Sequence, residues 1–460
     1  MKIIIIILQA ILNLVRKRRD LIANRSKIPP EYRDDVVVWY SPKKQRLTNY
    51  DVIESYAEDF TYWTINNTSI TSAQKKIVIP AGTELEYIIA YRGFNASTDG
   101  FDIKYTGNIA ITYRYNKEDG TVGTIAIDKS GIYHLPASVR AQKNFGFYCN
   151  PQTVTEEATI EQFPTSILKD FSGNGLDAYM YGFTGKLNSG VGIYKEDFTG
   201  YSNKDAVINP FTAILTYNTK SLLFYYNVMT KDIESYNINV KGIINEHVIF
   251  FYKDEEGIEQ QFHISKDGNY TVPKCYRVGT SGTATGYTAF NTNEDTAITI
   301  TQIPDYPNSL CYASKQYCKA YGLPIFDDYT IIARRTWFDK DGIFANKGIG
   351  NYITNTAFAF EYKANNKTVT STASFGGWNN VNIPNEGISY QTKNKYNNAD
   401  ITYSIGIDKS EEFAIGAYNS DNHGNFEGCH DDIIVFKRSL AINEINDITE
   451  AIFNETIIEE

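Results

Sequence analysis

Two stretches of this chain match each other position by position, and this internal repeat constrains the fold more than any other feature. The first reads ITYRYNKEDGTVGTIAIDKSGIYHLP (residues 111–136) and the second reads VIFFYKDEEGIEQQFHISKDGNYTVP (residues 248–273). In both, hydrophobic residues alternate with polar ones, as they do along a half-buried β-strand. Gly120 and Gly257 each follow an acidic residue at the same place, which predicts a hairpin turn. A duplicated β-hairpin is therefore expected.

The repeat extends beyond these hairpins and marks two insertions. Both copies close on similar strings, TIEQFP at residues 159–164 and TITQIP at residues 299–304. Only two copies occur, with unrelated sequence between them, so a stacked repeat protein is not expected. We predict a small β-sandwich module at residues 56–164 and a second, homologous module at residues 202–304. Each module would interrupt the same parent domain.

Three segments remain outside the modules, at residues 33–55, 165–201 and 305–452, and together they have the length of one large β-sandwich. Two of them contain VVVWY and YTIIARRTWF, apolar runs rich in the β-branched and aromatic residues that are typical of strands. The 35 Tyr and 25 Phe residues of the whole chain support the same interpretation. A last strand is expected in DDIIVFKRSL, followed by a short polar helix from Ala441. The predicted fold class is all-β.

Residues 1–28 differ from the rest, since an apolar run from Ile3 to Val15 is followed by the basic cluster RKRR. The run is too short to span a bilayer, which takes about 20 residues. A signal peptide is one interpretation, although no small-residue cleavage site follows. The preferred interpretation is an α-helix over residues 1–28, stopped by Pro29 and Pro30. Its isoleucines have a coiled-coil spacing that favours trimers, so we expect a homo-oligomer. The residues at this spacing are Ile4, Ile7, Ile11 and Leu14.

Two strings in the parent segments resemble the laminin-G-like, concanavalin-type lectin jelly roll. They are DFSGNGLDAYMYG, which starts at Asp170, and GCHDDIIVFKRSLAINEIND, which starts at Gly428. In that family a D-x-S-G-N-G turn opens an early strand, and the terminal strand runs into a short helix. The resemblance implies a concanavalin-like jelly roll that the two modules interrupt. The strings VVVWYSPKKQRLTN, LKDFSGNG, DYPNSL and GLPIFDDYTIIARR also resemble structural proteins of phages that infect gut Bacteroidetes, including crAss-like phages. This resemblance implies that the helix over residues 1–28 also contacts other virion proteins.

The turn that starts at Asp170 carries oxygen atoms of the kind that Ca²⁺ prefers, on Asp170, Asn174 and Asp177. Many domains of the resembling family bind calcium, so Ca²⁺ is the cofactor that the resemblance implies. The competing interpretation is that Asp170 and Asn174 hydrogen bond to the backbone of their own turn, as such side chains commonly do.

The sequence contains no recognisable catalytic motif. Glycoside hydrolases of the concanavalin-type fold would carry an E-x-D-x-x-E strand, and that string does not occur. The five histidines are scattered and the five cysteines form no CxxC pair, so neither a zinc site nor a disulfide framework is expected. Alternation along a strand would point the side chains of CHDD (residues 429–432) to opposite faces. We therefore predict that the chain is not an enzyme.

Two loops have the chemistry of a carbohydrate site, with an aromatic ring for stacking and amide or carboxylate groups for sugar hydroxyls. They are GGWNNVN (residues 376–382) and AYNSDNHGN (residues 417–425), and binding residues concentrate in loops. The competing interpretation is that both are solvated connections. The candidate ligand-binding residues are Trp378, Asn379, Tyr418, Asn419, Asp421 and Asn422.

Together these features favour a non-enzymatic phage fibre or adhesin that binds glycan on the bacterial surface through the jelly roll. One alternative is a capsid decoration protein that binds no sugar, and another is an exported bacterial glycan-binding protein. The net charge of −10 argues against a nucleic-acid partner, because phosphate binding needs clustered Lys and Arg. The expected location is the virion, with the bacterial cell surface as the alternative.

Overall fold

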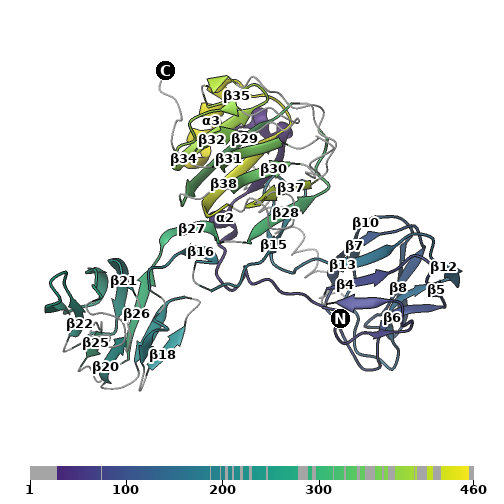
Figure 1. Ribbon diagram of the computed structural model, residues 1–460, viewed down its shortest axis with the longest axis horizontal. Helices are drawn as coiled ribbons and strands as arrows, with labels where there is room; N and C mark the ends of the chain where they lie inside the picture. Colours follow the sequence, from purple (N-terminus) through teal and green to yellow (C-terminus); the bar gives the residue numbers. More distant parts are fainter. Residues whose placement is uncertain are drawn as a thin grey trace, which may run out of the picture. The chain divides into compact units, whose positions relative to one another are not determined.

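The computed structural model shows a chain built mostly of antiparallel β-sheets (Figure 1). It describes residues 28–454 except for residues 74, 187, 197, 203–205, 210–211, 218–220, 227–230, 245–246, 278–288, 293–296, 314, 326–327, 339–341, 348–357, 365–366, 371–378, 398, 401–411 and 418–425. The chain divides into two compact units: residues 54–167 form one, and residues 1–53 and 168–460 form the other. The predicted all-β fold class is confirmed. The predicted N-terminal helix, with Ile4, Ile7, Ile11 and Leu14, lies outside the described residues.

The parent sandwich has two large sheets whose strands come from three separate parts of the sequence. The first sheet has the order β16 (Gly190–Ile193), β27 (Asp305–Tyr312), β38 (Gly428–Phe436), β29 (Thr330–Trp337), β34 (Glu386–Thr392), β35 (Lys395–Tyr396) and β36 (Ala399–Asp400), with β1 (Val36–Tyr40) pairing with β38. The second has the order β14 (Ile167–Leu168), β15 (Ala178–Tyr181), β28 (Tyr317–Tyr321), β37 (Glu412–Ile415), β30 (Gly342–Lys347), β31 (Phe358–Ala364), β32 (Lys367–Thr370) and β33 (Asn379–Asn380).

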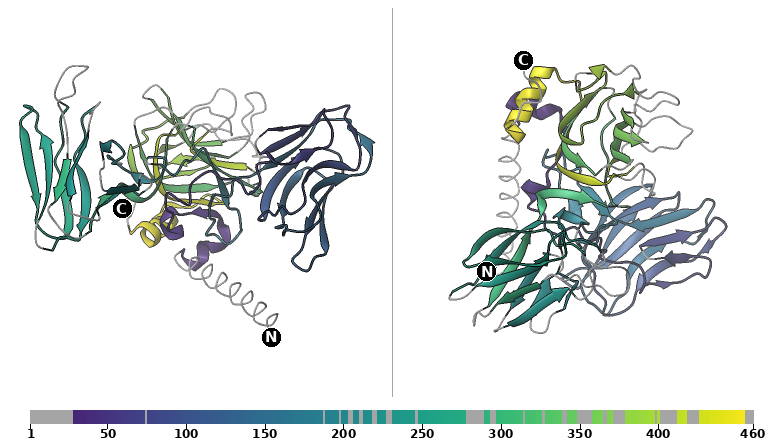
Figure 2. Two further views of the ribbon diagram at one scale, coloured as in Figure 1. Left: turned by 90° about the horizontal axis from the view of Figure 1, so that it is seen from below. Right: turned by 60° about the vertical axis from the view of Figure 1, so that its left-hand side comes forward.

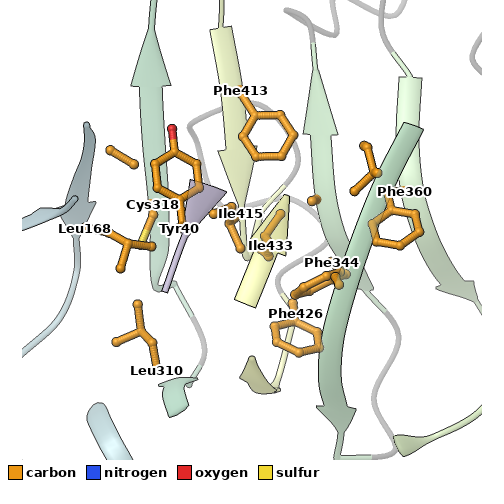
Figure 3. Packing of buried hydrophobic residues seen from close by; sticks show 14 of the residues in the cluster. Tyr40, Leu168, Leu310, Cys318, Phe344, Phe360, Phe413, Ile415, Phe426 and Ile433 are labelled. Atoms are coloured by element: carbon orange, nitrogen blue, oxygen red, sulfur yellow. The ribbon is translucent and has the colours of Figure 1, made fainter. Parts of the chain in front are cut away.

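A single hydrophobic core joins the two sheets of the sandwich. Figure 3 shows Tyr40, Phe413 and Ile433 among the side chains that pack there. In β29, Ile331 faces this core, whereas the neighbouring Ile332 belongs to a separate cluster on the outer face. The strand is therefore buried on both sides, which explains why its sequence is a nearly continuous apolar run.

The outer face of the first sheet is covered by helix α3 (Ile442–Phe453), which begins one residue after Ala441, as predicted (Figure 2). Its buried Ile445 and Ile448 pack in one cluster with Ile434 of β38. Two short helices, η1 (Pro30–Asp35) and α2 (Pro42–Gln45), flank β1. Within the described part of the chain, no helix is long and apolar enough to cross a membrane.

The first module is a sandwich of two small sheets that share one core. One sheet has the order β2 (Thr64–Ile65), β6 (Ile88–Arg92), β11 (Phe145–Cys149), β8 (Ile111–Asn116) and β9 (Val122–Ile127). The other has the order β10 (Gly131–Leu135), β7 (Phe101–Thr106), β13 (Ala158–Gln162), β4 (Lys76–Ile79) and β3 (Thr71–Ala73). A short pair, β5 (Glu84–Leu85) and β12 (Gln152–Thr153), lies outside both sheets.

The second module repeats the two five-stranded sheets of the first strand for strand. Its first sheet has the order β17 (Tyr201–Ser202), β20 (Ser221–Tyr226), β25 (Ala289–Thr292), β22 (Val248–Lys253) and β23 (Glu259–Ile264). Its second has the order β24 (Gly268–Val272), β21 (Tyr236–Lys241), β26 (Ile298–Ile303), β19 (Ile214–Tyr217) and β18 (Ala206–Asn209). The predicted pair of homologous β-sandwich modules is confirmed. The core of the second module also includes Phe198 and Tyr201, which precede residue 202.

Candidate functional site

A β-bulge in β38 shapes the outer face of the first sheet. Ala333 pairs with Ile433, but the next pair is Arg335 with His430, so Arg334 lies opposite two residues of β38. Such a bulge adds an unpaired residue and re-aims side chains locally. The two residues are Asp431 and Asp432, the acidic end of the CHDD string.

The bulge overturns the expectation of simple alternation along CHDD. Asp431 contacts Ser309 and Arg334, and Asp432 contacts Trp39, which belongs to the outer-face cluster. His430 instead lies inside the sandwich, where its Nε2 is 3.0 Å from the Tyr312 hydroxyl. Two consecutive carboxylates therefore lie on the same side of the sheet, because the extra residue breaks the alternation.

Beside Asp431, four adjacent strands enclose a polar hollow of about 180 Å³. The hollow, called the outer hollow below, joins aromatic, amide, guanidinium and carboxylate groups in one place. Its lining residues are Tyr306, Pro307, Asn308 and Ser309 from β27, Arg334, Arg335 and Thr336 from β29, Glu386 and Gly387 from β34, and Cys429 and Asp431 from β38.

Asp431 is the best-positioned carboxylate of the outer hollow. It accepts a hydrogen bond from the Ser309 hydroxyl, and its Oδ2 lies 3.6 Å from Nε of Arg334. Asp431 and Arg334 are each about one third exposed, at 33% and 36%, so both can exchange hydrogen bonds with a bound molecule. Glu386 and Asn308 are exposed at the rim.

Tyr306 supplies the aromatic surface of the outer hollow. Its φ of 51° lies in the left-handed region, which a bulky residue seldom adopts outside strained or functional sites. Its ring centroid lies 6.2 Å from that of Phe338. The half-buried ring is thus held at the hollow by an unusual backbone conformation.

Asp432 lies next to the hollow but is almost fully covered. Trp39 Nε1 donates to it over 2.6 Å, and Lys44 Nζ lies 3.5 Å from the centroid of the Trp39 ring. Burial raises the pKa of Asp432 to about 6, although hydrogen bonds from Trp39 and Ser41 oppose the shift. This carboxyl group can therefore hold a proton at mildly acidic pH.

A buried ion pair lies beneath the outer hollow. The Arg335 guanidinium donates to Glu361 through Nε over 2.6 Å and through Nη2 over 2.7 Å, and both side chains are fully buried. Glu361 also accepts hydrogen bonds from Trp337 and Tyr396, over 3.2 and 2.8 Å, and from Ser389. A buried pair is retained only when such bonds satisfy it, and here they fix β29 against β31 of the second sheet.

Two of the five cysteines form a disulfide, although the sequence predicts no disulfide framework. Cys311 of β27 and Cys429 of β38 are directly opposite each other and form a disulfide. Cys429 lines the outer hollow, so the bond ties two of its walls together. Cys318 is free and buried, and burial raises the pKa of its thiol to about 12, which makes it unreactive.

The predicted calcium residues close a turn. Asp170 Oδ1 accepts from the backbone N–H groups of Trp39 and Ser172, and Oδ2 accepts from Ser172 and Leu176. Asn174 donates its amide to the carbonyls of residues 36 and 37. Asp177 accepts from the backbone N–H of Asp170 over 2.8 Å.

The bonds that Asp170 accepts from Ser172 and Leu176 are the ones that the Asx-turn interpretation expects. The bonds that involve Trp39 and Asn174 instead join the turn to β1. Among the described residues, no group of three or more His, Cys, Asp or Glu side chains is placed to hold a metal ion. Calcium binding at this turn stays a prediction.

The predicted sugar-binding loops fall mostly outside the described residues. Trp378, Tyr418, Asn419, Asp421 and Asn422 lie there, and Asn379 is described only as a backbone position in β33.

Simple alternation along CHDD does not predict the outer hollow, because it leaves out the bulge. The sequence signal for the hollow is the DYPNSL string, which holds Tyr306, Asn308 and Ser309.

The comparisons with known proteins name no family. No family model and no curated protein matches the chain. Solved structures do match. One is domain 4 of a GH43 extracellular arabinanase from Geobacillus stearothermophilus with arabinotriose, at 10% identity and a TM-score of 0.23, covering 30% of this chain and 75% of that one. Another is Trypanosoma rangeli sialidase with sialic acid, at 9% identity and a TM-score of 0.21, covering 88% and 90%.

These matches correct one prediction and leave others untested. Sialidases are enzymes, and their presence among the matches contradicts the exclusion of an enzyme, which is withdrawn. Both matched structures hold a bound sugar. Their TM-scores are far below 0.5, so they assign no activity to this chain. The laminin-G type and the phage origin stay predictions.

Proposed function

We propose that this chain binds carbohydrate and that the outer hollow receives one sugar residue. The observation that carries the proposal is the convergence of an aromatic ring, Tyr306, with the charged groups of Arg334 and Asp431. Carboxylate and guanidinium groups bind neighbouring hydroxyls in pairs, since each offers two hydrogen-bonding atoms in one plane. The ring supplies an apolar face against which a sugar ring can pack.

The size of the outer hollow limits the size of the ligand that it can bind. Pockets for drug-sized ligands measure about 300–1,000 Å³. The hollow, at about 180 Å³, is smaller. It therefore suits a single sugar unit, such as the end of a chain or a side branch, while the rest of the glycan stays in solvent.

The walls of the outer hollow are also preorganised by covalent and ionic links between strands. The Cys311–Cys429 disulfide joins β27 to β38, and the Arg335–Glu361 pair holds β29 from below. Preorganised walls lower the ordering cost of binding.

The place of action in this proposal is outside the bacterial cytoplasm, on a virion or a cell surface. Disulfides persist in oxidising surroundings, and the Cys311–Cys429 bond supports such a location. The phage-like strings support the virion, where the chain would serve as a fibre or adhesin, with a trimer formed through residues 1–28. Antibodies against the chain should label intact phage particles; labelling of bacterial cells alone would refute the virion assignment.

Binding to a glycan array tests the site itself. Asp431→Asn keeps the size of the side chain but removes its charge, and it should weaken binding roughly tenfold or more, because hydrogen bonds to charged groups contribute about 1.5–3 kcal/mol. Asp400→Asn, on β36 of the same sheet, is the matched control and should bind like the wild type. If Asp431→Asn binds normally while Trp378→Ala does not, the site is in the predicted loops instead. Release of free sugar from the bound glycan would show that the chain also hydrolyses it.

A further inference from the structure

Two histidines of the second module lie against each other on its outer surface. The ring centroids of His247 and His263 are 5.4 Å apart, with the ring planes tilted by 45°. His263 lies in β23, and His247 comes directly before β22, a strand labelled in Figure 1. The two strands are paired, with Ile249 opposite His263. The next residues inward, Val248 and Ile264, are buried, so both imidazoles lie on the solvent side.

The first module shows that the fold does not require this pair. At the equivalent positions of the repeat, Ala110 stands in place of His247 and Ala126 in place of His263. Both alanines are exposed, and the strands around them have the same register as in the second module. Two neighbouring positions thus differ together between the copies, and each difference exchanges a methyl group for an imidazole.

The pair contributes little to the fold by itself. His263 is exposed, and exposed surface substitutions usually change stability by less than about 0.5 kcal/mol. When both rings are protonated, they place two like charges on adjacent strands, which is unfavourable. A role in packing therefore does not explain why both positions carry histidine.

We propose that His247 and His263 together bind a divalent transition-metal ion, such as Zn²⁺ or Ni²⁺, with water at the remaining positions. Neutral imidazole is a ligand that suits Zn, Ni and Cu. A tetrahedral ion that binds one nitrogen of each ring at about 2.0–2.1 Å sets the ring centroids roughly 5 Å apart. The observed separation of 5.4 Å is close to this value.

The ion would act as a cross-strand clamp. β23 is an edge strand of its sheet, held to the module through β22. An ion that bridges the two strands stabilises the folded hairpin in proportion to its occupancy, because an unfolded hairpin does not hold the rings together. The site lies in the second module and does not depend on the outer hollow.

Titration calorimetry of the full-length, untagged chain with ZnCl₂ or NiCl₂ tests the proposal after removal of metals with a chelator. The wild type should show one site, and His263→Ala and His247→Ala should each abolish it. The matched control is His134→Ala, an exposed histidine of the first module, and it should bind as the wild type does. Hydrogen exchange of residues 247–264 should slow when metal is added to the wild type and not when it is added to His263→Ala.

Grafting the pair into the first module gives the positive control. The double variant Ala110→His/Ala126→His should gain a second, similar site, because the two hairpins share their register. Binding that survives both single His variants of the second module would overturn the proposal, as would a wild type that binds neither metal at millimolar concentration. A graft without a second site would overturn the claim that two rings at these positions are sufficient.

Discussion

The two modules share a core geometry more closely than they share a sequence. In the first, Phe60 and Trp63 meet edge to face at 5.1 Å, and Trp63 stacks on Phe147 at 5.3 Å. In the second, the corresponding contacts are Phe198 with Tyr201 at 5.7 Å and Tyr201 with Phe290 at 6.1 Å. Trp63 and Tyr201 differ in type, yet the cluster keeps its arrangement.

The backbone at the centre of this cluster is also duplicated. Phe60 and Phe198 are fully buried, and both have a φ of 60°, in the left-handed region. In each copy the residue three places on donates its backbone N–H to the carbonyl of this phenylalanine. A conformation that is costly for a bulky side chain occurs in both copies, so the tight turn is a built-in part of the module.

The surfaces of the modules have diverged instead. The exposed Tyr62 of the first module corresponds to Gly200 in the second. His134 Nδ1 lies 2.7 Å from Asp102, and the same cross-strand pair in the second module is Thr271 with Asn237. The comparison teaches that the duplicated fold was kept while the two surfaces acquired different chemistry.

The largest expected effect comes from removing the central phenylalanine of either module. Phe60→Ala and Phe198→Ala should each lower the local free energy of unfolding by about 3–5 kcal/mol, since each leaves a cavity inside an aromatic cluster. Hydrogen exchange with mass spectrometry localises the loss to residues 54–167 or to residues 198–304. Equal losses support equivalent cores; a loss of less than about 1 kcal/mol in one copy would break the equivalence.

A fall in pH should lower the stability of the parent sandwich more than that of either module. Burial lowers the pKa of His430 to about 3, below the ordinary value of 6.5, so the unfolded state binds the proton more tightly. The sandwich should lose stability as the pH falls from about 6.5 to about 3, by up to roughly 5 kcal/mol. The histidines that the structure describes in the modules are not buried, so burial of this kind acts only in the sandwich.

Asp432 contributes to the pH dependence of stability with the opposite sign. Its pKa of about 6 lies above the ordinary value of 3.8, so its share of the stability is present below pH 3.8 and is lost as the pH rises through 6. The variant His430→Gln removes the histidine contribution and serves as the control in a pH series of hydrogen exchange. A wild type and a His430→Gln variant with the same acid response would contradict this assignment.

A smaller effect on stability is expected at two hydrogen-bond acceptors that occupy equivalent positions in the two modules. The backbone N–H of Asn116 donates to the Ser138 hydroxyl over 3.0 Å, and that of Lys253 donates to the Cys275 sulfur over 3.4 Å. Ser138→Ala leaves a buried donor unpaired and should lower the unfolding free energy by about 1–3 kcal/mol. Cys275→Ser keeps an acceptor and should change it by less than about 1 kcal/mol. Chemical denaturation followed by exchange of each module measures both, and a reversed order would show that the sites are not equivalent.

The smallest effect should be identical in the two copies. The hydroxyl of Tyr133 donates to the carbonyl of Lys129 over 2.8 Å, and that of Tyr270 donates to the carbonyl of Lys266 over 2.7 Å. Both bonds are exposed to solvent, so Tyr133→Phe and Tyr270→Phe should each lower the unfolding free energy by about 0.5 kcal/mol or less. A difference between the two variants larger than this value would show that the turns diverged.

Local patterns predicted the repeated strands but not the shared start of the modules. Alternation and the glycine turns place β8, β9 and β10 and their copies, because these features depend on neighbouring residues. The strings YAEDFTYW (residues 56–63) and YKEDFTGY (residues 194–201) show that the repeat begins earlier than residue 202. This signal lies in the sequence and could have been found there.

The outer hollow and the disulfide could not be predicted in the same way. Cys311 and Cys429 are 118 residues apart, and their contact follows from the strand order of the sheet. The hollow depends on the bulge at Asp431 and Asp432, where an inserted residue shifts the register by an amount that no local pattern reveals. Sequence reasoning identified the strands but not the row of residues at which four of them meet.

The pairing of β1 with β38 has a consequence for synthesis on the ribosome. Val36 pairs with Phe436, so the first strand is translated long before its partner. At about 5–20 residues per second, the chain between them takes roughly 20–80 s to synthesise. Both modules are synthesised well before then and can fold while β1 is still unpaired. An unpaired strand edge can pair with another chain and so promotes aggregation. Chaperone demand during translation should therefore fall on β1 and should end only when β38 leaves the ribosome.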